Sequence, residues 1–193
     1  MSTTQPIRDR EELQRFKNYY LLDKPNYRNY ALIITGLNTA LRINDILHLT
    51  WDMVFDDGNI RKHIELKEQK TGKTNRILLN AELRAVLVQY RSQFHAQYPQ
   101  WGPYLFISQR RSGNPLSRYQ AYRIIRHAAE TVGLDKNISC HSLRKTFGYY
   151  AWKQGIPPAM LMCIFNHSSF QITRRYLCID QDDKDAVFSN IRL

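Results

Sequence analysis

Apolar residues recur at helical spacing along most of the chain. Leu13, Phe16 and Tyr20 repeat every three or four positions, which predicts a helix over about residues 10–22 with Asp9 as its N-cap. Capping residues and prolines mark the boundaries of further helices. These cover about residues 27–37, 81–97, 117–131 and 141–155, a segment opened by Pro157 and Pro158, and a segment capped by Ser168 or Ser169.

The period changes from helical to strand-like after residue 54. Ile60, Ile64 and Leu66 alternate with polar residues, as they do in a half-buried strand. A turn signal at 55–59 separates this strand from a short strand before it. A second turn signal at 70–73 leads to the third predicted strand, residues 75–79. We therefore expect a mainly α protein with a small three-stranded antiparallel β-sheet, an α+β class.

Length and composition favour one domain that binds a polyanion. The 193 residues suit a single domain over 1–193, with a flexible N-terminus at 1–6 and a C-terminal tail at 181–193. Lys and Arg outnumber Asp and Glu by 28 to 17, and the net charge of +11 favours binding to nucleic acid. A generic basic protein and a membrane-surface binder are the alternatives. No apolar run is long enough for a membrane span, and the N-terminus lacks the apolar core of a signal peptide. Three cysteines without CxxC spacing suit reduced thiols in a cytoplasm and argue against a zinc site.

Four residues in the last third of the chain suggest chemistry on a phosphate. His141 and Arg144 lie three positions apart and share a face of their predicted helix, and His167 and Tyr176 follow. Arginine offers a planar fork to phosphate oxygens, histidine donates a hydrogen bond or moves a proton, and tyrosine can act as a covalent nucleophile. Each residue alone is as readily structural, but the ordered set favours a site.

An arginine far upstream is a candidate for the same site. Arg42, in TALRINDIL, lies amid apolar residues, so its charge must face outward or be paired. Asp45, three positions later, is the expected partner. The alternative is an exposed Arg–Asp pair of little energetic value.

Other basic residues predict a surface that follows a phosphate backbone. The second hairpin carries Lys67, Lys70 and Lys73 as a basic finger. Solvated charge without a ligand is the alternative reading of these groups. The remaining candidates for DNA contact are Arg110, Arg111, Arg118, Arg123, Arg126, Lys145 and Arg175.

In these motifs the chain resembles the catalytic domain of the tyrosine recombinases, the phage integrase family. Arg42 is similar to the first arginine of the family, and Lys70, in KTG, to its hairpin lysine. HSLRKTFG resembles the His-x-x-Arg box, and NHSS places His167 as the second histidine. Tyr176 lies nine positions after His167, where the family has its nucleophile. The resemblance covers about residues 7–179.

Two features depart from the family pattern. The Leu-Gly pair that usually precedes the second histidine is Phe165-Asn166 here. Most members also carry a helical DNA-clamping domain ahead of the catalytic one, whereas here the match begins almost at Met1. We therefore expect either a one-domain recombinase, similar to the fimbrial phase-inversion type, or an excised catalytic domain.

The resemblance implies site-specific DNA recombination or integration through a covalent 3′-phosphotyrosine. The arginines would stabilise charge on the phosphate, the histidines would move a proton or orient the phosphate, and the lysine would protonate the leaving 5′ oxygen. Neither a metal nor a nucleotide cofactor is expected, because the phosphotyrosine stores the bond energy for rejoining. The catalytic residues so assigned are Arg42, Lys70, His141, Arg144, His167 and Tyr176.

The implied partners are double-stranded DNA and further copies of the chain, as a dimer or tetramer assembled on that DNA. Accessory DNA-bending proteins fit the same scheme. The tail at 181–193 would dock on a neighbouring protomer, with packing on its own domain as the alternative. Two other functions share these motifs: a nicking and resealing activity like that of type IB topoisomerases, and a non-catalytic DNA-binding regulator.

Overall fold

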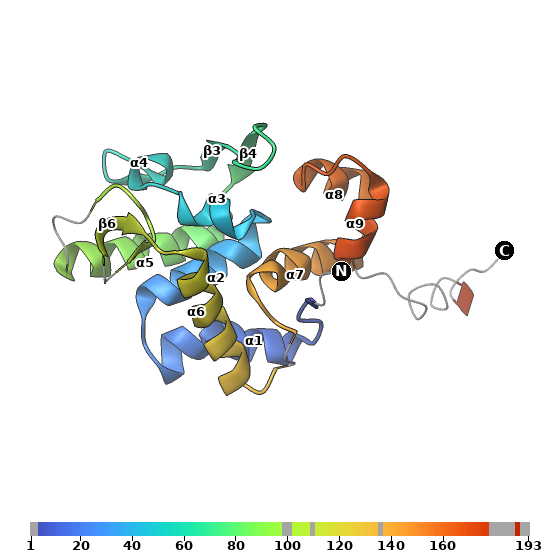
Figure 1. The fold of residues 1–193 in the computed structure, drawn as a ribbon, viewed down its shortest axis with the longest axis horizontal. Coiled ribbons are helices and arrows are strands. Elements are labelled where there is room, and N and C mark those ends of the chain that lie inside the picture. Colours follow the sequence, from blue (N-terminus) through green and yellow to red (C-terminus); the bar gives the residue numbers. More distant parts are fainter. Residues whose placement is uncertain (1–3, 98–101, 109–110, 135–136, 178–187, 190–193) are drawn as a thin grey trace.

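The computed structural model describes residues 4–97, 102–108, 111–134, 137–177 and 188–189. Helices make up most of these ranges (Figure 1). None of the described helices is long and apolar enough to cross a bilayer. In chain order they are α1 (Arg10–Asn18), the π-helical turn η1 (Tyr19–Asp23), α2 (Tyr27–Thr39), α3 (Ile43–Leu47), α4 (Trp51–Val54), α5 (Ala81–Gln97), α6 (Arg118–Thr131), α7 (Cys140–Lys153), α8 (Pro158–Ile164) and α9 (Phe170–Leu177).

The predicted helices are confirmed, and side-chain caps at two of them form hydrogen bonds. The Asp9 side chain accepts from the Glu12 backbone N–H at 2.8 Å, which satisfies a donor that the first turn of α1 leaves free. Ser117 caps α6 in a reciprocal capping box with Gln120. Local sequence therefore determined where these helices begin.

Within the described residues the strands form three separate two-stranded sheets, so the expectation of a single three-stranded sheet is wrong. The predicted strand over 60–66 breaks after Ile60: the Arg61 N–H turns back to the Val54 carbonyl at 2.8 Å, whereas the Lys62 carbonyl accepts from Leu79 at 2.9 Å. Because neighbouring residues pair with different segments, the ladders do not join. The antiparallel pairs are β1 (Phe55–Asp56) with β2 (Asn59–Ile60), β3 (His63–Lys67) with β4 (Thr74–Leu78), and β5 (Ile107–Ser108) with β6 (Arg111–Pro115).

Helix α2 is the centre of the main core. Residues 31–37 are all buried, and α2 packs against α1, α5 and α7. A second apolar cluster of Ala40, Leu161, Phe165 and Leu177 lies under α8 and α9. In Figure 1 these two helices form the orange and red lobe above α7, and the β3–β4 hairpin leans toward α8. The segments that carry the candidate residues therefore converge where the hairpin meets this lobe.

The N-terminal segment is held against the domain from Thr4 onward, which differs from the expected flexible end at 1–6. The Gln5 N–H donates to the Asn137 carbonyl at 3.2 Å, and the Ile7 N–H donates to Thr146 Oγ1 at 2.9 Å. Ile7 is buried in the main core. At the other end, only Phe188 and Ser189 of the tail at 181–193 lie within the described residues, so its docking on a second protomer stays a prediction.

We predict that Gly36→Ala lowers the free energy of unfolding by about 1–3 kcal/mol, the usual cost of overpacking a core. A Cβ at Gly36 would lie 2.4 Å from Cδ1 of Leu143, where α2 crosses α7. In an uncrowded helix the same change would stabilise the protein by about 1 kcal/mol. Urea denaturation measures the difference.

The control is the same change made in a Leu143→Ala background, which removes the clash with Cδ1 and leaves only the 3.2 Å approach to Cβ. There Gly36→Ala should cost much less stability. An equal loss of stability in both backgrounds would contradict close packing of α2 on α7.

Candidate active site

Arg144 lies at the bottom of the site and is 1% exposed. It sits on α7, one turn after His141, and its guanidinium donates to the carbonyls of Ala40 and Phe165. The buried Nε of Arg144 has no hydrogen-bond partner among the described residues. A guanidinium has five donors, so two are used for structure and others stay available to a bound anion.

Tyr176, on α9, packs against both candidate histidines and above Arg144. Its ring centroid lies 4.9 Å from that of His141 and 4.6 Å from that of His167. Cζ of Arg144 lies 5.6 Å from the same ring. Four of the six predicted catalytic residues, drawn from three separate segments, therefore meet around one phenol.

His167 is oriented by Thr173 of α9. Its Nδ1 lies 3.0 Å from Oγ1 of Thr173, which is fully buried. When the Thr173 hydroxyl donates to Nδ1, the proton of a neutral imidazole lies on Nε2, which can donate to another group. Thr173 could not be singled out from the sequence, because a hydroxyl that orients a histidine has no characteristic spacing.

Arg42 joins the site from the N-cap of α3, but its partner is Glu68 and not the expected Asp45. Nη1 of Arg42 lies 2.5 Å from Oε2 of Glu68, whose side chain is completely buried, while the Arg42 side chain stays 18% exposed. Asp45 instead accepts the backbone N–H of Gln69 at 2.9 Å. One feature of the sequence does indicate that Glu68 is buried. It lies two positions after Leu66 and four after Ile64, on the same buried face of the strand pattern.

Lys70 lies at the turn of the β3–β4 hairpin with its side chain exposed. No hydrogen bond or ion pair holds its ammonium within the described residues. Its charge is one of those that lower the pKa of His141, which shows that the hairpin turn lies within electrostatic reach of the site. A long unrestrained side chain in this place can move toward a ligand bound over Arg42 and Arg144.

Burial and clustered positive charge keep the two histidines neutral. Burial, followed by the charges of Arg144 and of other cations, lowers the pKa of both His141 and His167 to about 4. Burial also lowers the pKa of Arg144 to about 10, so this guanidinium stays charged at neutral pH. At that pH the site thus offers fixed cations and neutral imidazoles.

Two other groups in the site have shifted pKa values. Burial raises the pKa of the Tyr176 phenol, and the charges of Arg144 and Arg42 only partly offset that effect. Burial also pushes the pKa of Glu68 upward, but its hydrogen bonds outweigh burial and hold the pKa below the usual range. The phenol is therefore protonated at neutral pH, and the carboxylate is ionised.

The expected DNA-contacting residues fall into different environments. Arg118 and Arg123 on α6 are exposed, as are Lys67 and Lys73 on the hairpin. Arg126 is largely engaged, with Glu130 at 2.8 Å and the Ile138 carbonyl at 3.4 Å. Lys145 is buried and donates to the Thr4 carbonyl at 2.5 Å, so it does not present its charge to solvent. Arg110 and the side chains of Arg111 and Arg175 lie outside the described part of the structure.

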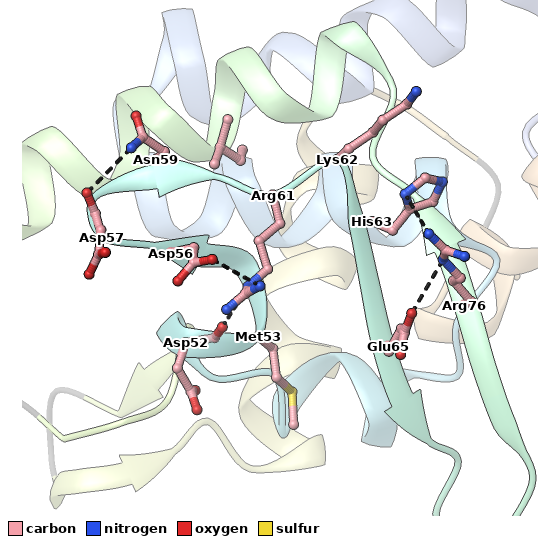
Figure 2. Close-up of a pocket in the computed structure, with 11 residues that line it drawn as sticks. Asp52, Met53, Asp56, Asp57, Asn59, Arg61, Lys62, His63, Glu65 and Arg76 are labelled. Atoms are coloured by element: carbon pink, nitrogen blue, oxygen red, sulfur yellow. Dashed lines mark hydrogen bonds and ion pairs between the residues drawn. The ribbon is translucent and has the colours of Figure 1, made fainter.

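A charged hollow on the outer side of the hairpins is separate from this site. Figure 2 shows two ion pairs among its side chains, Arg61 with Asp56 and Arg76 with Glu65, and the N···O distance in each is 3.3 Å. None of the six candidate catalytic residues lines it. Within the described ranges, no group of three or more His, Cys, Asp or Glu side chains is arranged to hold a metal ion.

Sequence comparison assigns the family. The phage integrase family matches residues 9–182. The chain belongs to the phage integrase family. It is 43% identical over 188 residues to a probable integrase/recombinase, YoeC, of Bacillus subtilis, with 97% of each chain covered. It is 37% identical to tyrosine recombinase XerD of Corynebacterium glutamicum over 171 residues, which cover 83% of this chain but 51% of XerD. It is 30% identical to the type 1 fimbriae regulatory protein FimB of Escherichia coli, over 77% of this chain and 72% of FimB.

Solved structures of tyrosine recombinases share the fold of this integrase-family chain. XerA recombinase superposes with a TM-score of 0.80 at 20% identity, over 98% of this chain and 67% of XerA. XerH, a site-specific recombinase bound to its palindromic difH substrate, superposes with a TM-score of 0.76 at 23% identity, over 97% of this chain and 52% of XerH. The mainly α fold class with small antiparallel sheets is thereby confirmed.

The departure from the family's Leu-Gly pair has a structural explanation. Asn166 occupies the glycine position with φ of 51°, a left-handed conformation that asparagine adopts more readily than other non-glycine residues. Phe165 is fully buried, and its ring lies 5.4 Å from that of Tyr176. The substitution therefore keeps the backbone turn that places His167.

We predict that the protein loses stability as the pH falls from 7 to 5.5, partly through these two histidines. In the unfolded chain an imidazole binds a proton near pH 6.5, whereas in the folded protein His141 and His167 bind one only near pH 4. Between these values the unfolded state holds more protons, so the free energy of unfolding rises with pH. Urea denaturation at several pH values measures the slope.

The matched variants are His141→Asn and His167→Asn, made singly and together. Each change should flatten the dependence of stability on pH, and the double variant should flatten it most. An unchanged slope in the double variant would show that neither imidazole is held neutral by the fold.

Proposed function

We propose that this integrase-family protein is a site-specific DNA recombinase that cleaves and rejoins strands through a covalent 3′-phosphotyrosine. The observation that carries the proposal is the position of Tyr176, whose ring contacts His141 and His167 and lies above the guanidinium of Arg144. A tyrosine used only for packing has no need of two imidazoles and a buried cation. A phenol that attacks a phosphate needs all of them.

In this scheme Oη of Tyr176 attacks the phosphorus, a new O–P bond forms, and the bond to the 5′ oxygen breaks. Negative charge grows on the non-bridging oxygens in the transition state. Arg42 and Arg144 reach these oxygens from fixed positions, which is the preorganised arrangement that stabilises developing charge without reorganisation. Because the 3′-phosphotyrosine conserves the bond energy, the reverse attack by a 5′ hydroxyl rejoins the strand, and neither a metal nor a nucleotide is required.

Two protons must move during cleavage. The pKa of the Tyr176 phenol is raised by burial, so attack at neutral pH requires a base. His141 is neutral because its pKa is about 4, and it is positioned against the phenol ring, so it accepts this proton. His167, oriented by Thr173, donates from Nε2 to a phosphate oxygen. Lys70 supplies the second proton to the departing 5′ oxygen.

Strand exchange joins ends from two duplexes, so the proposal includes further copies of the chain assembled on DNA as a dimer or tetramer. The exposed cations Lys67, Lys73, Arg118 and Arg123 are the proposed contacts to the phosphate backbone. Lambda integrase has been solved as a dimer on a core-site DNA, and its fragment shares this fold with a TM-score of 0.69. Accessory DNA-bending proteins and exchange of the C-terminal tail belong to the same proposal.

We predict that the protein forms a covalent complex with nicked DNA in the presence of EDTA, and that Tyr176→Phe forms none. A suitable substrate is a duplex selected from a random pool for tight binding, with a nick placed so that cleavage releases a short fragment and prevents rejoining. The complex is read on a denaturing gel, and peptide mapping identifies the modified residue. The reason is that phenylalanine keeps the ring packing but removes the attacking oxygen.

Tyr149→Phe and Tyr150→Phe are the matched controls and should trap DNA as the unchanged protein does. Both tyrosines face the N-terminal segment: the Tyr150 hydroxyl donates to the Arg8 carbonyl at 2.9 Å, and Cζ of Arg8 lies 5.6 Å from the Tyr149 ring. Covalent trapping by Tyr176→Phe, or its loss in EDTA, would disprove the assignment.

We predict that Lys70→Ala slows cleavage of ordinary DNA by about a hundredfold or more, the usual contribution of a general acid. An ammonium can release a proton, which a guanidinium does poorly. DNA with sulfur at the bridging 5′ position has a leaving group that needs no proton. The variant should therefore cleave the sulfur substrate at nearly the normal rate, as single-turnover measurements would show.

Three further variants separate acid catalysis from binding. Arg42→Ala should stay slow on both substrates, because its role is to stabilise charge. Lys67→Ala and Lys73→Ala should mainly weaken DNA affinity. If Lys70→Ala is equally slow on the sulfur substrate, Lys70 is a phosphate contact, and His141 becomes the next candidate for the acid.

A further inference from the structure

We propose that Glu68 is a positioning residue. Together with Asn166, it holds Arg42 and the β3–β4 hairpin, which carries Lys70, in a fixed position relative to His167. This inference rests on the proposed recombinase function. The family resemblance did not point to Glu68, and its sequence motif carries no chemistry of its own. The role follows from the hydrogen bonds that converge on its carboxylate.

The Glu68 carboxylate accepts four hydrogen bonds from side chains on three different segments. Oε2 accepts from Nη1 of Arg42 at 2.5 Å and from Oγ1 of Thr71 at 2.9 Å. Oε1 accepts from Nδ2 of Asn75 at 3.1 Å and from Nδ2 of Asn166 at 2.8 Å. The side chain is completely buried, so these donors replace the water that an ionised carboxylate would otherwise bind.

Three of the four donors either have a proposed role in cleavage or lie next to a residue that does. Thr71 adjoins Lys70 at the hairpin turn, Asn166 adjoins His167, and Arg42 is itself a phosphate clamp. Three elements that are distant in sequence thus share one fixed point. Because a displacement of about 1 Å in a reacting group can slow a reaction about a hundredfold, such a fixed point affects the rate.

The backbone around Glu68 reinforces this arrangement. The Glu68 N–H donates to the Lys73 carbonyl at 2.9 Å, and the Glu68 carbonyl accepts from Gly72 at 2.8 Å, so the turn that carries Lys70 closes on this residue. The next residue, Gln69, donates its N–H to the Asp45 carboxylate on α3 at 2.9 Å. The hairpin is therefore tied to the helix that follows Arg42 as well as to Asn166.

The geometry leaves Arg42 able to bind a phosphate while it is held. Only Nη1 is engaged by Glu68, and the other guanidinium nitrogens have no hydrogen-bond partner within the described residues. An ion pair that used all the N–H groups of the guanidinium would compete with DNA. A single contact through Nη1 instead orients the guanidinium and leaves its other N–H groups for the phosphate oxygens.

The test is Glu68→Gln in single-turnover cleavage of the same nicked DNA at saturating protein. Glutamine has the same shape but no charge, and its amide nitrogen meets a donor where an acceptor is needed. We expect cleavage to slow by about tenfold to a hundredfold, while the dissociation constant for DNA changes by less than about threefold, because the surface cations are untouched. Glu65→Gln is the matched control: it removes the same charge from β3, the strand that leads into Glu68, and breaks only the exposed pair with Arg76 seen in Figure 2.

Coupling distinguishes positioning from general support of the fold. If Glu68 acts through Arg42, then Glu68→Gln slows an Arg42→Ala protein much less than it slows the unchanged protein. The part of this slowing that acts through Lys70 should likewise be smaller on DNA with sulfur at the bridging 5′ position. Equal slowing in every background would mean that Glu68 only supports the fold, and that outcome would overturn the inference.

Asn166→Gly gives an independent variant that preserves the backbone. Asn166 has φ of 51°, which glycine adopts without strain, so this change removes the contact to Glu68 and leaves the turn intact. We expect cleavage to slow by about twofold to tenfold, with near-normal thermal stability. Normal cleavage by both Glu68→Gln and Asn166→Gly would reject the positioning role. Failure of the unchanged protein to form any covalent complex would instead reject the recombinase function.

Discussion

A buried guanidinium needs acceptors that cannot move away, and Arg144 finds them at the ends of two helices. The carbonyl of Ala40 follows the last turn of α2, where the chain turns into a left-handed conformation with φ of 55°, and the carbonyl of Phe165 follows α8. Carbonyls at helix C-termini lack intrahelical partners and carry partial negative charge. Arg144 satisfies both carbonyls, and in doing so it joins the end of α2 to the C-terminal lobe.

The position of Tyr176, the proposed nucleophile, depends on this contact between α2 and the C-terminal helices. Phe165 packs beneath Tyr176 and beside Arg144, with Cζ of Arg144 4.7 Å from its ring. Close approach of Phe165 to α7 requires Gly148, because a Cβ there would lie 2.8 Å from the end of the phenylalanine ring. Arg144, a proposed catalytic residue, is thus also a structural residue, and its position depends on the packing of α7, α8 and α9.

The same burial explains the charge state of the site. Burial, together with the charges of Arg144 and Arg42, strongly disfavours positive charge on His141 and His167. Among the described residues, the buried acids are Asp45 and Glu68, and the charge of Glu68 only partly offsets the effect of the arginines on the pKa of His167. The site therefore keeps an excess of fixed positive charge, which suits a phosphodiester that brings negative charge of its own.

Properties set by neighbours in sequence were predictable, because they depend on local spacing and capping. The helices and the cap at Asp9 followed from local spacing, and the six candidate catalytic residues followed from motifs that resemble those of the family. Pairing between distant segments was not predictable. The strand after Ile60 divides because Arg61 and Lys62 find different partners, Arg42 pairs with Glu68 across 26 positions and not with nearby Asp45, and Lys145 is turned inward to meet Thr4. Spacing along a helix or strand fixes which face a residue occupies, whereas only the folded chain decides which distant group satisfies a buried charge.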